Sequence, residues 1–136
     1  MQKKRRSSFL YSHKELYKQE ENYTIVGLCM EVHRILGPGL LEIVYKDALE
    51  LEFKNAKIEY SREKEYAVNY KGIILSHKFY ADFVIFDKII LEIKSCKSLN
   101  DEHIAQCLNY LKVSNNKLAL LINFGESRLN YKRIIL

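Results

Sequence analysis

The chain has 136 residues, 48% hydrophobic and 29% charged, a composition typical of one compact globular domain with a single core. Its net charge of +5 is weak support for a nucleic-acid partner, because the basic cluster at 3–6 supplies most of the excess and the rest of the chain is nearly neutral. No apolar run approaches the roughly 18–20 residues of a membrane span, and too few apolar residues follow the basic start for a signal peptide.

The three cysteines, Cys29, Cys96 and Cys107, are an odd number and show no C-x-x-C spacing. They indicate reduced thiols rather than a disulfide framework or a zinc site. The histidines show no metal-ligand spacing either. We therefore expect a cytoplasmic protein without a membrane partner.

The first part of the chain predicts two helices. Residues 1–19 are expected to be a flexible basic segment that precedes a single domain over 20–136. Apolar residues recur at helical spacing over 20–36, and Gly-Pro-Gly at 37–39 ends that helix. A second helix is expected over 40–55, with Lys46, Asp47, Glu50 and Lys54 on its polar face. Its inner positions include Leu41, Val44, Tyr45, Ala48, Leu49 and Phe53.

From residue 58 onwards the hydrophobic period changes to two, which predicts an antiparallel meander. Its segments are 58–72, as one long or two short strands, then 73–86 and 88–95. A helix over 100–116, with Asn100 or Ser98 as N-cap, leads to a strand over 117–124 that is apolar enough to be buried on both faces. Residues 132–136 suit an edge strand. The order α-α-β-β-β-α-β predicts an α/β fold with a mixed four-stranded sheet, in which 118–124 runs parallel to 89–94.

Two acids and a lysine interrupt the most apolar strands: Asp82, Glu92 and Lys94. Charged side chains on such strands are costly to bury unless they are paired or bound to a metal. An exposed sheet face or an internal Glu–Lys pair would explain any one of them. A two-residue turn between the strands would put Asp82 and Glu92 on opposite faces, whereas a three-residue loop or a bulge would put them on one face. A shared site therefore requires an odd-numbered loop or a bulge.

Further polar side chains lie among apolar positions of the helices. Glu42 falls inside the apolar arc of the helix over 40–55, although Glu52 does so too, and a boundary position would explain either. His103, Gln106 and Tyr110 share one face of the helix over 100–116, as residues of a partly buried polar rim would. Three carboxylates and a lysine are also what metal-assisted phosphodiester hydrolysis needs, since carboxylates bind Mg²⁺ and a lysine can orient or deprotonate water.

Taken in order, these residues resemble the signature of the PD-(D/E)xK nuclease superfamily. Asp82, Glu92 and Lys94 match D-x9-E-x-K, with Ala81 in place of the usual proline. Residues 39–45, GLLEIVY, match the G-x-x-E-x-x-Y motif of one group in that superfamily, the GxxExxY proteins. Four segments are similar to that group as a whole: 31–49, 81–95, 106–111 and 120–125.

The resemblance implies a restriction-endonuclease-like αβββαβ core, with the mixed four-stranded sheet flanked by helices, and a magnesium-dependent nuclease that hydrolyses phosphodiester bonds of DNA. It implies Lys94 as the catalytic lysine. The ligands of Mg²⁺ or Mn²⁺ would be Glu42, Asp82, Glu92 and the carbonyl of Ile93. Gln106 and Tyr110 match a Q-x-x-x-Y helix found in the RecB-like branch, where these residues support the site or the DNA. The supporting or substrate-binding residues expected are Tyr45, His103, Gln106 and Tyr110.

Membership of a family does not identify a substrate, so alternatives stay open. The first reading is a nuclease with DNA as its partner. The second is a nuclease-fold module that binds nucleic acid or a partner protein without cleaving, which the nearly neutral body favours. A purely structural interaction protein has no positive signal in the sequence, and a homodimer is left open.

Overall fold

The computed structural model describes residues 13–136, with side chains from Gln19 onwards. The basic cluster at 3–6 lies outside the described residues, and the first helix begins at His13, within the segment 1–19 that the sequence assigns to a flexible arm. None of the described helices is long and apolar enough to cross a membrane. The elements in chain order are α2 (His13–Leu36), α3 (Glu42–Asn55), β1 (Tyr60–Tyr70), β2 (Ile73–Ile85), β3 (Ile89–Lys94), α4 (Asp101–Ser114), β4 (Leu118–Asn123) and β5 (Asn130–Ile135).

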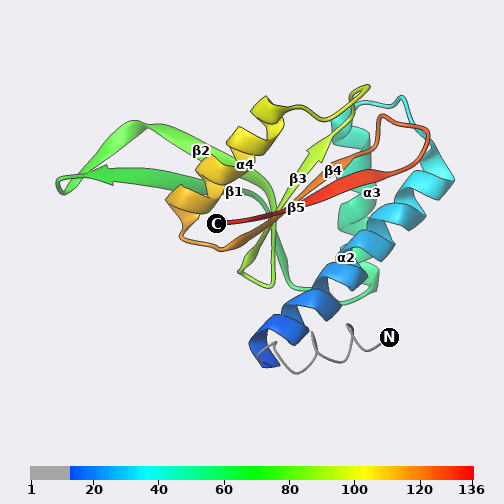
Figure 1. Cartoon of the computed structure of the whole chain (residues 1–136), viewed down its shortest axis with the longest axis horizontal. Helices are drawn as coiled ribbons and strands as arrows, with labels where there is room; N and C mark the ends of the chain where they lie inside the picture. The colour runs from blue at the N-terminus through cyan, green and yellow to red at the C-terminus, as the bar shows by residue number, and fades with distance from the viewer. Residues whose placement is uncertain (1–12) are drawn as a thin grey trace, which may run out of the picture.

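The strands form one mixed sheet in the order β1-β2-β3-β4-β5. Strand β4 runs parallel to β3 after the crossover through α4, as predicted, and the other neighbours are antiparallel. Helices α2 and α3 cover one face of the sheet and α4 covers the other (Figure 1). The predicted α/β fold is confirmed. In the described part of the chain, the sheet has five strands rather than the expected four. The fifth is β5, which pairs with β4 where the sequence predicts an edge strand.

The central strands β3 and β4 form the middle of the core. Every residue of β4 is buried, as expected for a strand covered on both faces. Helix α3 packs on the sheet through Tyr45, Leu49 and Phe53, which are fully buried. The expectation that Leu41 and Val44 also face inwards is wrong: their exposed fractions are 74% and 37%. Leu41 precedes the helix as its N-cap, and Val44 is rotated away from the row at four-residue spacing.

Gly125, just after β4, lies against the backbone of Cys96 so closely that a side chain has no room there. A Cβ atom there would lie 2.2 Å from the carbonyl oxygen of Cys96 and 2.3 Å from its nitrogen. Both are backbone atoms, so no side-chain rotation relieves the overlap. We expect Gly125→Ala to lower the free energy of unfolding by about 1–3 kcal/mol, measured by urea denaturation.

Gly27→Ala is the matched control. Gly27 is an exposed position in α2, and an added Cβ meets no atom within 4 Å. The substitution should raise the free energy of unfolding by about 0.5–1 kcal/mol, because alanine favours the helix. Equal effects of the two substitutions would contradict the close approach at Gly125.

Candidate active site

A three-residue loop sets the register of β2 and β3. Ile85 pairs with Ile89, and residues 86–88 connect them. Phe86 and Asp87 adopt left-handed backbone conformations, with φ of 54° and 56°. Since Val84 pairs with Ile90 and Phe83 with Leu91, one further step places Asp82 opposite Glu92. The odd-numbered loop that a shared site requires is therefore confirmed.

The pairing of β2 with β3 ends at Phe83 and Leu91, and beyond it the side chains of Asp82 and Glu92 form the hydrogen bonds between the strands. The N–H of Asp82 donates to Oε2 of Glu92 at 2.8 Å, and the N–H of Ile93 donates to Oδ2 of Asp82 at 2.8 Å. Each carboxylate thus accepts from the backbone of the opposite strand. The two acids fix each other at the point where β2 and β3 separate.

Glu92 is buried next to a second carboxylate, that of Asp82. Glu92 is only 3% exposed. Its burial, together with the neighbouring Asp82 carboxylate, raises the pKa of Glu92 to about 8, although the N–H of Asp82 and the ammonium groups of Lys94 and Lys46 act in the opposite direction. In the protein without a bound cation, Glu92 therefore holds a proton at neutral pH.

Lys46 is the residue of this site that the sequence analysis missed. Its Nζ donates to Oδ1 of Asp82 at 3.0 Å and also to Oε1 of Glu63. Burial disfavours the ammonium, but the two carboxylates outweigh that effect and raise the pKa of Lys46, which stays charged. The helical pattern assigned Lys46 to the polar face of α3; the only signal in the sequence is its position four residues after Glu42.

Glu63 reaches Lys46 from an unusual backbone conformation. It lies in β1 between the paired residues Arg62 and Lys64, yet its φ is 54°. A non-glycine residue inside a strand rarely adopts this conformation, and such strain is concentrated at functional sites. The strand is therefore distorted next to Asp82.

Lys94 and the polar face of α4 meet beside the two acids. Nζ of Lys94 donates to Oε1 of Gln106 at 3.0 Å. One turn further along α4, burial followed by the charges of Glu92 and Asp82 raises the pKa of Tyr110 to about 12. The structure thus gathers Lys94, Gln106 and Tyr110 around Asp82 and Glu92.

Comparison with known protein families agrees with this arrangement. The model of the PD-(D/E)XK nuclease superfamily matches residues 19–134, almost all of the described chain. The chain belongs to the PD-(D/E)XK nuclease superfamily. Members of this superfamily are typically metal-dependent. No curated protein resembles the chain closely enough to count as a match.

A solved structure supports the fold. The crystal structure of SSO0001 is similar to this protein with a TM-score of 0.56 and 22% sequence identity. The match covers 88% of this chain and 60% of that one, so this protein spans less than two thirds of the other. At this identity the likeness concerns the fold alone, and that fold is consistent with a restriction-endonuclease-like core.

Glu42, the first of the three acids predicted as metal ligands, is not gathered with the other two. It is exposed at the start of α3 and lines a hollow of about 560 Å³ together with Ser95, Cys96 and Lys97, the residues that follow Lys94. Among the residues whose side chains the structure describes, no three His, Cys, Asp or Glu are close enough together to hold a metal ion. Ligation by Glu42 therefore stays a prediction.

Tyr45 and His103 make structural contacts. The Tyr45 hydroxyl donates to the carbonyl of Gly37 at 2.5 Å and accepts from the N–H of Leu40, and its ring stacks on Phe124. It thereby anchors the Gly-Pro-Gly loop ahead of Glu42. His103 forms a reciprocal capping box with Asn100, which is the N-cap predicted for α4. A direct role of either residue toward substrate remains a prediction.

Asn123 fixes the chain on the far side of Lys94, and the sequence analysis gave it no role. It is fully buried at the end of β4. Its Oδ1 accepts from the N–H groups of Cys96 and Gly125, and its Nδ2 donates to the carbonyl of Cys96. The amide ties the segments after β3 and β4 together, and so holds the end of β3 that carries Lys94.

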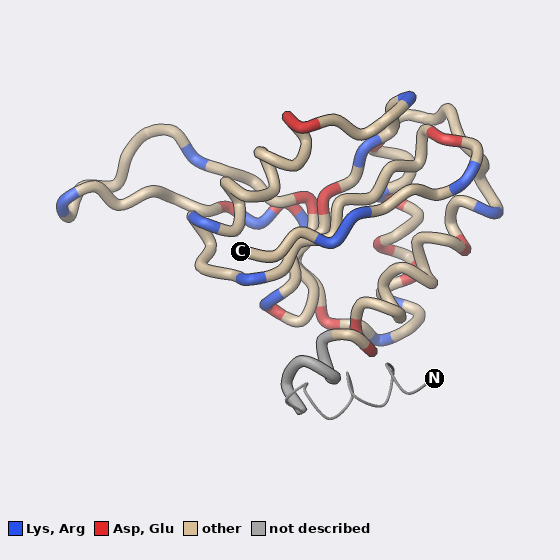
Figure 2. Tube along the Cα trace, viewed as in Figure 1, with Lys and Arg blue, Asp and Glu red and all other residues tan. Residues whose placement is uncertain are grey.

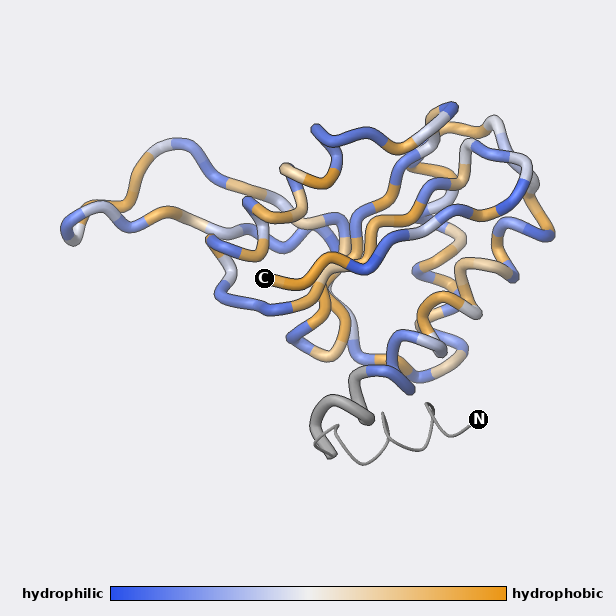
Figure 3. Tube along the Cα trace, in the orientation of Figure 1, coloured by the Kyte–Doolittle hydropathy of each residue, from blue (hydrophilic) through white to orange (hydrophobic). Residues whose placement is uncertain are grey.

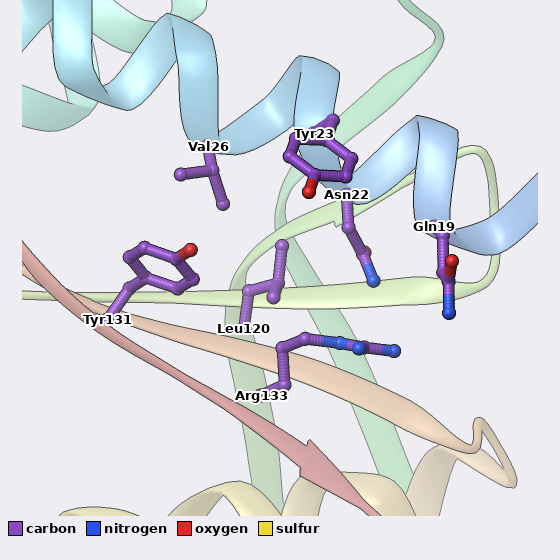
Figure 4. Close-up of a pocket in the computed structure, with 7 residues that line it drawn as sticks. All are labelled: Gln19, Asn22, Tyr23, Val26, Leu120, Tyr131 and Arg133. Atoms are coloured by element: carbon purple, nitrogen blue, oxygen red, sulfur yellow. The ribbon is translucent and has the colours of Figure 1, made fainter. Parts of the chain in front are cut away.

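A second cavity lies away from these acids. It has a volume of about 260 Å³ and lies between α2 and the strands β4 and β5. Figure 4 shows Asn22 and Tyr23 of α2 facing Tyr131 and Arg133 of β5. The Asn22 amide is buried without a hydrogen-bond partner among the described residues. None of the predicted site residues lines this cavity.

The raised pKa of Glu92 predicts a pH dependence of stability. Between about pH 4.5, the ordinary value, and about pH 8 the folded protein binds more protons than the unfolded chain, so the free energy of unfolding falls as pH rises. Glu92→Gln cannot titrate and should remove this fall, which reaches up to about 1.4 kcal/mol per pH unit. Urea denaturation in EDTA at several pH values measures it. Glu59→Gln, at an exposed acid, should follow the wild-type profile; a Glu92→Gln profile parallel to wild type would refute the assignment.

The Lys46 contacts predict a matched pair of stability effects. Lys46→Met keeps most of the stem but leaves Asp82 and Glu63 without their shared ammonium, so we expect a loss of about 1.5–3 kcal/mol in the free energy of unfolding. Lys54→Met, at an exposed position of the same helix, should cost less than about 0.5 kcal/mol. Similar losses in the two variants would show that Lys46 is only a surface lysine.

Proposed function

We propose that this protein is a Mg²⁺- or Mn²⁺-dependent nuclease that hydrolyses phosphodiester bonds of DNA. The observation that carries the proposal is the reciprocal Asp82–Glu92 pair with Lys94 beside it. Lys46 pairs with Asp82, but Glu92 is buried beside that second carboxylate. Its burial, followed by the Asp82 charge, raises the pKa of Glu92 to about 8, and a divalent cation would favour its ionised form.

The residues present fit such an ion. Asp82, Glu92 and the carbonyl of Ile93 offer hard oxygen donors at the point where β2 and β3 separate, and Mg²⁺ prefers oxygen ligands with several positions left to water. Glu42 would add a donor from the start of α3. When bound, the ion would neutralise charge on the scissile phosphate and make water a better nucleophile at neutral pH.

The remaining side chains orient the reacting groups. Gln106 holds the Lys94 ammonium in place, so that it can donate to a phosphate oxygen or orient the attacking water. Lys46 donates a hydrogen bond to Oδ1 of Asp82 and so fixes the position of that carboxylate. Tyr110 adds a hydroxyl within the electrostatic influence of the two acids, and this hydroxyl can donate a hydrogen bond at neutral pH.

We further propose that the chain is one of the GxxExxY proteins. The three parts of the motif have separate structural settings here. Gly39 has φ of 99°, which favours glycine, Glu42 is exposed at the helix start, and Tyr45 anchors the loop from within the core. The spacing of the motif would follow from these settings, because Gly39 and Tyr45 fix the loop that places Glu42 at the helix start.

One observation favours the alternative, a module that binds nucleic acid without cleaving it. Lys46 already supplies positive charge to Asp82, and Glu42 is not gathered with the other acids. A protein that kept the ammonium in this position would use the surface around the acids for binding alone. Cleavage assays decide between the two.

Substitution of Lys94 distinguishes a nuclease from a module that binds nucleic acid without cleaving it. If it acts on the reacting groups, Lys94→Ala should lower the rate of Mn²⁺-dependent cleavage of labelled DNA by roughly 10²-fold or more. Lys132→Ala, at an exposed lysine of β5 that does not line the hollow at Glu42, should cut at the wild-type rate. The rate is expressed per folded molecule, with the folded fraction taken from a thermal melt in the same buffer.

Two results would overturn the nuclease assignment. One is a Lys94→Ala protein that cleaves at the wild-type rate once its folded fraction is taken into account. The other is a wild-type protein that fails to cleave single-stranded and duplex DNA with either metal, although it is fully folded.

A further inference from the structure

The outer part of the β1–β2 hairpin projects from the body of the protein (Figure 1). Strand β2 pairs with β3 only at 83–85, so residues 66–80 form a two-stranded ribbon with no third strand beside it among the described elements. Its tip is a defined two-residue turn: Lys71 and Gly72 both have positive φ, and the N–H of Gly72 donates to Oδ1 of Asn69 at 2.8 Å. We call residues 66–80 the ribbon.

Apolar side chains on the ribbon are left in solvent. Ile73 is 66% exposed and Ile74 56%, and Tyr70 beside them is exposed too. Figure 3 shows this apolar stretch near the tip, away from the core. A two-stranded ribbon is marginally stable in water, and these residues add nothing to the core. Exposed apolar side chains gathered in this way mark an interaction surface.

The charge of the ribbon indicates what it contacts. Residues 66–80 include Lys71 and Lys78 and no acid, and Figure 2 shows only basic positions on the outer part. Glu65, at the base, lies 3.7 Å from Lys78 and leaves the tip uncompensated. Two ribbons from two copies would bring lysines together without an acid to offset them, and edge lysines oppose strand pairing. A polyanion complements the ribbon better than a second copy does.

An aromatic row connects the ribbon to the acids. The rings of His77 and Phe79 meet edge-on at 5.1 Å, and those of Phe79 and Tyr110 at 5.9 Å. Tyr110 in turn lies within the electrostatic influence of Glu92 and Asp82. Aromatic side chains provide sequence-tolerant stacking surfaces for bases. A strand bound along this row would lead from the ribbon to the candidate active site.

We propose that the ribbon is a DNA-binding arm. Its aromatic and apolar side chains contact bases, and Lys71 at the tip contacts the phosphate backbone. The inference rests on the proposed function in taking DNA as the substrate, and it adds where the DNA is held. Binding by the ribbon does not depend on the metal, so it is measured without cleavage.

The test uses the full chain in EDTA. The ribbon variant combines Lys71→Gln with Ile73→Thr and Ile74→Thr, which keep the β-branched shape that strands favour. The control combines Leu51→Gln with Lys54→Gln on α3, where Leu51 is 63% exposed. Fluorescence anisotropy with a short labelled DNA duplex, and with its single strand, gives affinity and salt dependence.

The ribbon variant should bind the better of the two DNAs about tenfold more weakly than wild type, as expected for lost base contacts. Its salt dependence should flatten by about one phosphate contact. The control should bind like wild type. Circular dichroism of all three proteins confirms that the surface substitutions leave the fold intact.

Unchanged DNA affinity in the ribbon variant would overturn the proposal, and so would a wild-type protein that binds neither DNA. Light scattering identifies the competing occupant: a wild-type dimer that becomes monomeric in the ribbon variant, with DNA affinity unchanged, would assign the ribbon to a second copy. If wild type binds DNA through the ribbon but never cleaves it with Mn²⁺, the nuclease assignment fails and the arm stands. If wild type cleaves DNA with Mn²⁺ while the ribbon variant binds DNA as tightly as wild type, the nuclease assignment stands and the DNA-binding arm is refuted.

Discussion

The backbone hydrogen bonds that the Asp82 and Glu92 carboxylates accept, from the N–H groups of Ile93 and Asp82, are the interaction on which the candidate active site depends. They exist only because a three-residue loop puts the two acids opposite each other, and a loop of two residues would send them to opposite faces of the sheet. Each carboxylate then accepts a hydrogen bond from a backbone N–H of the other strand, at the point where β2 and β3 separate. Burial, followed by the neighbouring Asp82 carboxylate, raises the pKa of Glu92, and a bound cation would favour the ionised acid that the proposed chemistry uses.

The surrounding fold holds this unfavourable arrangement in place. Tyr45 anchors the loop before α3, and Asn123 ties the chain after Lys94 to the end of β4. Gly125 allows the two segments to approach more closely than any side chain would permit. A buried protonated acid and a strained Glu63 both lower stability. The well-packed strands β3 and β4 offset those costs, as is usual where a site needs groups that packing alone would not select.

The sequence predicted the elements well because hydrophobic period and turn residues are local signals. The buried strand β4, its parallel pairing with β3 and the Asn100 cap of α4 all follow from such patterns. The sequence predicted that Asp82 and Glu92 share a face only on condition of an odd-numbered loop, because the residue types Phe86 and Asp87 do not predict the left-handed conformations that form it. Lys46 was missed because a helical wheel shows which face is polar, not which polar residue reaches across to another element. Leu41 was misplaced because the helix begins after it.

The central claim is that the Asp82–Glu92 pair is built to hold a divalent cation. Calorimetric titration of Mn²⁺ into the metal-free protein near pH 7, in two buffers of different ionisation enthalpy, tests it most directly. We expect saturable binding, with release of about one proton per ion from Glu92. Glu92→Gln should lose both this proton release and most of the affinity. If Glu92→Gln binds the ion with the same affinity and the same proton release, the ion is held elsewhere and the claim is wrong.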